Sequence, residues 1–329
     1  MPGREAQMHH WLEGRCGLFG FSLVAASSDA SFRRYFRLLL PDGETRIVMD
    51  APPAHEDCRP FVEVNQRLEA AGVHVPRIHA QDLERGFLLL EDLGDRFYLG
   101  ELDEASADRL YGEAIDTLLC IQRADASGLP DYDRALLARE MALFPDWLLD
   151  VHLGLDLAPA ERRMLDTVFE HLIDNALAQP RVLVHRDYHS RNLLVCDANS
   201  PGVIDHQDAV LGPVTYDLVS LLRDCYIAWP HERVAGWLDD YAAAAVAAGV
   251  LDEAQRARLP EWFDLMGVQR HLKAAGIFAR LYHRDGKSGY LGDIPRTLGY
   301  ILAVAERHPP VAPLAGFLER RVMPALQAA

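Results

Sequence analysis

Apolar and polar residues alternate along much of the first ninety residues, a pattern typical of β-strands that bury one face. Residues 22–40 alternate with a break from Ser27 to Ser31, and they predict two strands joined by a polar loop. The turn signal Pro-Asp-Gly-Glu at 41–44 precedes a third strand at 45–49, and further strands are predicted at 76–80 and 86–90. The pattern predicts a small antiparallel sheet that begins as a hairpin meander.

Helical spacing of apolar residues occurs twice in this part, at 4–19 and at 61–71, where Gly72 ends the run. From Ser106 onward helical spacing dominates, interrupted by short apolar runs before Asp187 and Asp205. The predicted helices cover 105–125, 133–153, 159–178, 214–226, 231–249, 252–282 and 313–327. We therefore predict an α+β fold with two lobes, a β-rich one over residues 1–93 and a mostly helical one over 94–329.

The composition narrows the class of protein. The 329 residues include 33 Lys and Arg against 49 Asp and Glu, and this net charge of −16 argues against nucleic-acid or membrane-surface binding. The five cysteines are scattered without a CxxC motif, so neither disulfides nor a zinc site is expected. The sequence has neither a signal-peptide pattern nor an apolar run of transmembrane length. We expect a cytoplasmic protein that acts as a monomer.

The strongest chemical signal lies within residues 182–205. A His-Arg-Asp tripeptide at 185–187 follows an apolar run, Asn192 comes five residues after Asp187, and a second apolar run leads to Asp205. This spacing matches the H-R-D-x-x-x-x-N catalytic loop of kinases followed by a metal-binding Asp. We predict that Asp187 orients the attacking hydroxyl, and that Asn192 and Asp205 bind the Mg²⁺ that bridges the nucleotide phosphates. Any one of these residues alone would be an ordinary turn residue.

The same tripeptide recurs at 283–285. Five residues after Asp285 stands Tyr290 rather than Asn, and the preceding residues have helical rather than strand character. This second copy is therefore not predicted to be a catalytic loop.

Four stretches together resemble the aminoglycoside phosphotransferase family of small-molecule kinases, which has the bilobal protein-kinase-like fold. They are SDASFRRYFR (28–37), GFLLLEDLGD (86–95), VHRDYHSRN (184–192) and VIDHQDAVLGPVTYDLVSLL (203–222). The resemblance implies that ATP is the co-substrate. It also places a phosphate-binding loop at Ser28, Ala30, Ser31 and Phe32, where small residues replace glycine; the alternative is an ordinary hairpin loop.

The nucleotide side shows one departure from the kinase pattern. The strand at 45–49 lacks the lysine that usually contacts the phosphates. Either Arg46 or a loop arginine substitutes for it, with Glu63 as the pairing partner, or the phosphates rely mainly on Mg²⁺ and backbone donors. The resemblance places the adenine hinge at Glu91 and Leu93, against the alternative of a buried strand ending in a turn.

Other polar residues have two interpretations each. Asp217 would steady the catalytic loop near His185 through backbone hydrogen bonds, or it is a first-turn helix Asp favoured by the helix dipole. Asp208 either reaches the substrate or faces solvent. Lys273 and Arg280, seven residues apart on one predicted helix face, either bind the acceptor or are ordinary surface charges.

Within the family, SDASFRRYFR, VMDAPP and the 203–222 stretch look most similar to bacterial anomeric sugar kinases. The resemblance implies ATP-dependent phosphorylation of the C1 hydroxyl of N-acetylmuramate and N-acetylglucosamine in peptidoglycan recycling. Lys273 and Arg280 would suit the lactyl carboxylate of N-acetylmuramate. The alternatives are an aminoglycoside, choline or homoserine kinase and, from another class, a nucleotide-binding pseudokinase scaffold.

Overall fold

The computed structural model describes residues 3–28, 32–305 and 307–328. Its first part is a five-stranded antiparallel sheet with strand order β1-β2-β3-β5-β4, and β1, β2 and β3 form the predicted meander. The strands are β1 (Ser22–Ser28), β2 (Arg34–Leu39), β3 (Thr45–Asp50), β4 (Ile78–Asp82) and β5 (Phe87–Glu91). Two helices, α1 (Arg4–Gly14) and α2 (Arg59–Ala70), accompany the sheet.

Both faces of this sheet are covered, because successive side chains of a strand point to opposite faces. On β5, Phe87 and Leu89 pack with Trp11 of α1, whereas Leu88 and Leu90 pack in the cluster that contains Phe61 of α2. The continuous apolar run of β5 therefore reflects burial on both sides.

The second part is mostly helical and carries the largest apolar core. Its α-helices are α3 (Tyr98–Glu101), α4 (Ala107–Arg123), α5 (Arg134–Met141), α6 (Pro159–Leu177), α7 (Tyr216–Leu222), α8 (His231–Ala247), α9 (Glu253–Asp285), α10 (Ile294–Ala305), α11 (Ala312–Phe317) and α12 (Met323–Ala328). The π-helices η1 (Phe144–His152) and η3 (Leu318–Val322), the 3₁₀-helix η2 (Ser288–Asp293) and the short strands β6 (Arg181–Val184), β7 (Leu193–Leu194), β8 (Gly202–Val203) and β9 (Val210–Pro213) complete it.

Three helical predictions need correction. The single helix predicted at 133–153 is α5 followed by η1, and the one predicted at 313–327 is three short segments. Helix α10 was not predicted, because glycines and a proline interrupt the apolar pattern around it. At Gly276, α9 approaches η1 so closely that a Cβ atom would collide with the backbone of Leu143. This contact fixes the spacing between the two elements.

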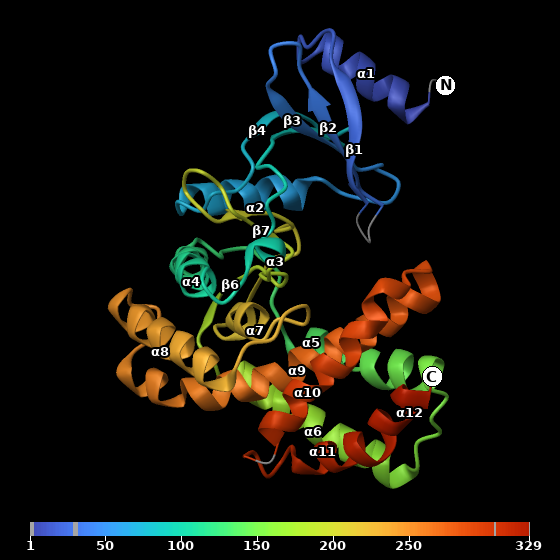
Figure 1. Cartoon of the computed structure of the whole chain (residues 1–329), viewed down its shortest axis with the longest axis vertical. Helices are drawn as coiled ribbons and strands as arrows, with labels where there is room; N and C mark the ends of the chain where they lie inside the picture. Colours follow the sequence, from blue (N-terminus) through green and yellow to red (C-terminus); the bar gives the residue numbers. More distant parts are fainter. Residues whose placement is uncertain (1–2, 29–31, 306, 329) are drawn as a thin grey trace.

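Figure 1 shows the sheet with α1 and α2 at one end of the molecule and the helices α5 to α12 at the other, with the short strands between them. Contacts that join the parts include the hydrogen bond from the backbone N–H of Val203 to the carbonyl of His74 (2.8 Å) and the packing of His206 on Phe61 of α2, with ring centroids 4.5 Å apart. The predicted lobe boundary at residues 93 and 94 falls just after β5 and remains a prediction. Among the described helices, none is long and apolar enough to cross a membrane.

Candidate active site

The predicted catalytic loop joins β6 to β7 at the centre of the chain. Strand β6 pairs with β9 and β7 pairs with β8, so both ends of the loop are held by sheet hydrogen bonds. Asp187 follows β6 and is partly exposed, while its neighbour Tyr188 is buried and donates its hydroxyl to the carbonyl of Ala114 (2.8 Å). The loop is thereby anchored on both sides of Asp187.

The backbone of this site adopts a left-handed conformation at two non-glycine residues, Arg186 (φ 77°) and Asp205 (φ 64°). Such residues are strained and persist only where their surroundings hold them. Asp217 of α7 stabilises the backbone conformation of Arg186, because its carboxylate accepts the backbone N–H groups of His185 (2.6 Å) and Arg186 (2.9 Å). These are the backbone hydrogen bonds expected for Asp217.

The structure brings Asp187, Asn192 and Asp205 together. The Asn192 side-chain amide donates to the backbone carbonyl of Asp187 (2.9 Å) and lies 3.5 Å from Oδ2 of Asp205. Gln207 donates to Oδ1 of Asp205 (2.8 Å), and the backbone N–H of Ile204 donates to the carbonyl of Asn192 (3.1 Å). The side chain of Asn192 therefore lies between the backbone of Asp187 and the carboxylate of Asp205.

The side chains of Asn192 and Asp205 are better suited to Mg²⁺, which needs few protein ligands, than to a metal that is bound by protein side chains alone. Within the described residues, no group of three or more His, Cys, Asp or Glu side chains is placed to hold a metal ion. Magnesium commonly binds through one or two protein oxygens and takes its other ligands from phosphates and water. Because Nδ2 of Asn192 is engaged with the Asp187 carbonyl, Oδ1 is the atom that remains for a metal.

A buried charge network lies beneath the loop and was not predicted. Glu140 of α5 contacts Arg186 of the loop, the ammonium group of Lys273 on α9 (2.9 Å) and the hydroxyl of Tyr132. Burial opposes ionisation of Glu140, but Lys273 and Arg186 hold its pKa below the usual range. Sequence offered no signal for Glu140, because its partners are distant in the chain.

This network changes the interpretation of Lys273. Its side chain is 11% exposed, and its ammonium group also donates to the Tyr216 hydroxyl (2.8 Å). Burial opposes ionisation of Asp187, but the nearby charges, Lys273 first among them, hold the pKa of that carboxyl low. Lys273 is therefore not an ordinary surface charge, and it shares the carboxylate of Glu140 with Arg186. Its predicted contact with an acceptor remains a prediction.

The other two acceptor candidates lie in different surroundings. Arg280 is half-buried on α9, and its Nε has no hydrogen-bond partner among the described residues. Burial and the charge of Arg284 lower the pKa of Arg280. Asp208 is exposed, and its backbone carbonyl accepts Arg186 (3.3 Å). Contact of either side chain with substrate remains a prediction.

On the nucleotide side, the predicted phosphate loop is described only at its ends. Ala30 and Ser31 lie outside the described residues, and Ser28 ends β1, where its backbone pairs with Arg34. Phe32 is 63% exposed, its ring stacks on His55, and its backbone N–H donates to Glu56 (3.3 Å). Their role in binding phosphate remains a prediction.

The ion pairs observed around the strand that lacks the usual lysine differ from the pair expected with Glu63. Glu63 pairs with Arg67 one turn along α2 (2.7 Å), and Arg46 pairs with Glu44 at the β2–β3 turn (2.7 Å). The loop arginine Arg33 instead pairs with Glu56 (3.6 Å). Glu63 is therefore not the partner of a substitute arginine, because its helix neighbour engages it.

The predicted hinge lies directly after β5. Glu91 is paired with Arg46 in the sheet, and its side chain accepts the backbone N–H of Arg77 (3.1 Å). Leu93 lies against Gly202 of β8, where a Cβ atom would meet its side chain at 2.8 Å. This contact brings the hinge segment against the β7–β8 hairpin that leads to Asp205.

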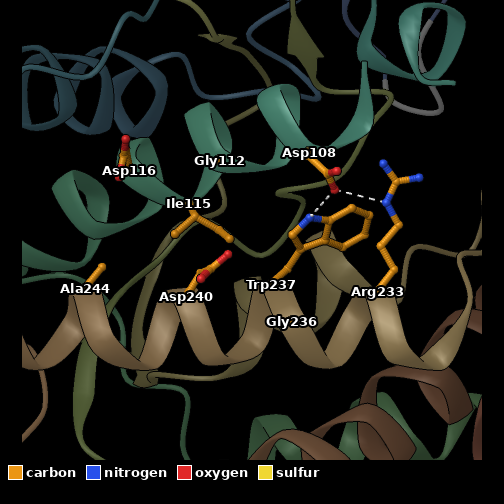
Figure 2. Close-up of a pocket in the computed structure, with 9 residues that line it drawn as sticks. All are labelled: Asp108, Gly112, Ile115, Asp116, Arg233, Gly236, Trp237, Asp240 and Ala244. Atoms are coloured by element: carbon orange, nitrogen blue, oxygen red, sulfur yellow. Dashed lines mark hydrogen bonds and ion pairs between the residues drawn. The ribbon is translucent and has the colours of Figure 1, made fainter. Parts of the chain in front are cut away.

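A cavity of about 410 Å³ lies elsewhere, between α4 and α8 (Figure 2). Trp237 and Arg233 of α8 both donate to the carboxylate of Asp108 there (3.0 Å each). None of the predicted site residues lines this cavity, so cavity shape alone would not have located the catalytic loop.

Residues 22–262 match the Phosphotransferase enzyme family, and the chain belongs to that family. Its relatives include proteins named N-acetylmuramate/N-acetylglucosamine kinase. The one from Pseudomonas putida is 55% identical over 294 residues, 89% of this chain and 86% of that protein. Those from Pseudomonas aeruginosa (51% identical, 90% of this chain and 87% of that protein) and Neisseria meningitidis (42% identical, 96% and 95%) match over similar lengths.

Solved structures confirm the predicted fold class. An ADP-bound aminoglycoside phosphotransferase, APH(2'')-Ib, superposes with a TM-score of 0.60 at 16% identity, over 90% of this chain and 97% of that one. Choline kinase from Cryptosporidium parvum superposes with a TM-score of 0.65 at 10% identity, over 96% and 100%. At such identities the likeness concerns the fold alone. The family and the kinase-named relatives confirm the predicted enzyme class, an ATP-dependent kinase.

Proposed function

We propose that this kinase transfers the γ-phosphoryl group of ATP to the C1 hydroxyl of N-acetylmuramate and N-acetylglucosamine. The observation that carries the proposal is the 55% and 51% identity, over most of both chains, to kinases named for these two sugars. The arrangement of Asp187, Asn192 and Asp205 supports it, because phosphoryl transfer needs a carboxylate and metal-binding oxygens side by side.

In this proposal Asp187 accepts a hydrogen bond from the C1 hydroxyl and orients it for in-line attack on the γ-phosphate. An anomeric hydroxyl is more acidic than an ordinary alcohol, so the demand on a general base is modest and positioning dominates. The hydrogen bonds from the loop backbone to Asp217 support this role, because they hold the peptide groups on either side of His185, two residues before Asp187.

Asn192 and Asp205 would hold Mg²⁺ through Oδ1 and the carboxylate, respectively. The ion would supply positive charge to offset the charge of the phosphates. The amide of Asn192 and the side chain of Gln207 orient these oxygens through their hydrogen bonds to the Asp187 carbonyl and to Asp205. We further propose that the adenine binds at the backbone of Glu91 and Leu93.

We also propose that the enzyme is a monomer, because every residue assigned to the site belongs to one chain. We place the reaction in the cytoplasm, where ATP is available, as a step in the recycling of peptidoglycan sugars. Light scattering of the purified protein tests whether it is a monomer.

A phosphoryl-transfer screen tests the function. Purified protein with radiolabelled ATP and Mg²⁺ should label N-acetylmuramate and N-acetylglucosamine but not aminoglycosides, choline or homoserine. ³¹P NMR of the product should show phosphate on C1, and reduction of the sugar to its alditol, which removes the anomeric hydroxyl, should abolish acceptance. Labelling of an aminoglycoside, choline or homoserine in place of the sugars would contradict the proposal. Nucleotide binding without transfer to any acceptor would favour the pseudokinase alternative.

A further inference from the structure

The catalytic loop carries an exposed arginine, Arg191, directly before Asn192. Its guanidinium carbon lies 4.6 Å from the ring centre of Tyr226 and 5.3 Å from that of Tyr290. Tyr290 in turn stacks on Phe278 of α9, with ring centroids 5.6 Å apart and an angle of 19° between the planes. Tyr226 follows α7 and Tyr290 lies in η2, so three separate segments of the helical part build an aromatic wall against this one loop residue.

Arg191 and Arg258 differ from five other described arginines that lie over aromatic rings, and of the two only Arg191 lies in the catalytic loop. Within the described part of the chain it forms neither a hydrogen bond nor an ion pair with a carboxylate. By contrast, several such arginines each hold a carboxylate: Arg4 and Arg34 hold Asp50, Arg186 holds Glu140, Arg223 holds Asp264 and Arg233 holds Asp108. In a chain with a net charge of −16, an exposed catalytic-loop arginine that no described carboxylate neutralises is suited to an anionic ligand.

The surroundings of Arg191 indicate which anionic ligand it binds. Both tyrosines belong to the helical part of the chain, whereas the hinge that would bind the nucleotide follows β5 of the sheet. Stacking on a ring occupies the face of a guanidinium and leaves its N–H edge available for a planar, two-pronged contact with a carboxylate. Lys273 and Arg186, the cations that act on Asp187, both pair with Glu140, whereas Arg191 has no such partner among the residues that the structure describes.

We propose that Arg191, which lies between the rings of Tyr226 and Tyr290, binds the lactyl carboxylate of N-acetylmuramate. This inference rests on the proposed function and adds the residue that distinguishes the two acceptors. N-acetylglucosamine lacks the lactyl group, so Arg191 contributes binding energy to one acceptor and not to the other. The residue thus determines specificity within a shared catalytic site.

The test is the ratio of kcat/KM for N-acetylmuramate to kcat/KM for N-acetylglucosamine, measured at saturating ATP and Mg²⁺. For Arg191→Gln we expect this ratio to fall about tenfold to a hundredfold, the loss expected for a charge-assisted contact, mainly through KM for N-acetylmuramate. Arg191→Lys keeps the charge but loses the planar fork, so its ratio should lie between those of the wild type and the Gln variant.

Arg233→Gln is the matched control. Arg233 also lies over two aromatic rings, Trp229 (5.0 Å) and Trp237 (5.3 Å), but it pairs with Asp108 in the groove between α4 and α8 (Figure 2). Its substitution should leave the ratio unchanged.

Several results would overturn the inference. A ratio that Arg191→Gln leaves unchanged would do so, whether both acceptors lose activity equally or neither does. So would a ratio that falls only in Arg280→Gln, because the carboxylate would then bind on α9. Wild-type protein that phosphorylates neither sugar would overturn the proposed function itself, and the inference with it. Residual turnover of N-acetylglucosamine shows that each variant is folded.

Discussion

The tripeptide His-Arg-Asp occurs twice in this chain, and the two copies have different environments. At 185–187 it follows a buried strand, its Arg has a left-handed backbone, and the carboxylate of Asp217 accepts two of its backbone N–H groups. At 283–285 it ends the long helix α9, where Arg284 pairs with the adjacent Asp285 (2.8 Å). The first copy is held by groups distant in sequence and the second largely by near neighbours, so the catalytic character lies in the surroundings and not in the three residues.

The largest expected effect is on kcat, and it distinguishes Asp187 of the first tripeptide from Asp285 of the second. Asp187→Ala should lower kcat by about a hundred- to ten-thousand-fold, because it removes the carboxylate that orients the acceptor hydroxyl. Asp285→Ala should leave kcat within about twofold, because the change is confined to a local ion pair at a helix end. ADP release with N-acetylglucosamine measures both. Comparable losses in the two variants would show that the environments do not separate the copies.

The next effect concerns the metal. Asp205→Ala should lower Mg²⁺-dependent turnover by about a hundredfold or more while the protein stays folded, because Asn192 would be left as the single predicted protein ligand. Turnover against Mg²⁺ concentration, with Asp285→Ala as the control, measures this. Near-normal Mg²⁺-dependent turnover would show that Asp205 is not a metal ligand.

A smaller effect is expected from the support of the first tripeptide. Asp217→Asn retains one carbonyl oxygen, but its amide group faces a backbone N–H of the loop, so one of the two hydrogen bonds is lost and a buried donor is left unpaired. We expect kcat to fall about tenfold to a hundredfold and unfolding free energy to fall by about 1–3 kcal/mol. Urea unfolding and steady-state kinetics measure the two. A stability loss without any loss of kcat would limit Asp217 to a structural role.

The smallest effect concerns the two histidines. Burial lowers the pKa of His185 to about 4, below the ordinary value of 6.5. Because the folded state disfavours the proton, the stability that His185 contributes is full above pH 6.5 and is lost as pH falls toward 4. Between pH 6.5 and 5 this loss should be roughly 1–2 kcal/mol.

Urea unfolding across that pH range tests the histidine prediction. His185→Gln should flatten the pH dependence, whereas His283→Gln, at the exposed second copy, should not. An unchanged pH dependence in His185→Gln would assign the acid sensitivity to other groups.

Much of the fold was predictable because its signals are local. Alternation, turn signals and the short apolar run of β5 located the five strands of the sheet, and helical spacing located α4, α6, α8 and α9. The break between α5 and η1 was not predictable, because η1 lies against Gly276 of α9, far away in the sequence. Helix α10 was missed because glycines and a proline interrupt its pattern.

In the candidate active site, too, the features with local sequence signals were predictable and the contacts between distant segments were not. The spacing of Asp187, Asn192 and Asp205 is a sequence property, so the motif identified a group of residues that the structure brings together. The partner of Lys273 is Glu140, 133 positions away in the numbering, and helical spacing cannot tell which distant element meets a helix face. The aromatic wall at Arg191 was missed for the same reason, because Tyr226, Phe278 and Tyr290 lie on separate segments.

The close contact at Gly276 has a consequence for how this protein tolerates mutation. A side chain of any size at this position would push α9 away from η1, and with it Lys273 on one side and Phe278 on the other. In a saturation library selected for kinase activity, position 276 should therefore accept almost nothing but glycine. Gly299 of α10, where a Cβ atom would meet nothing within 4 Å, should accept many residues.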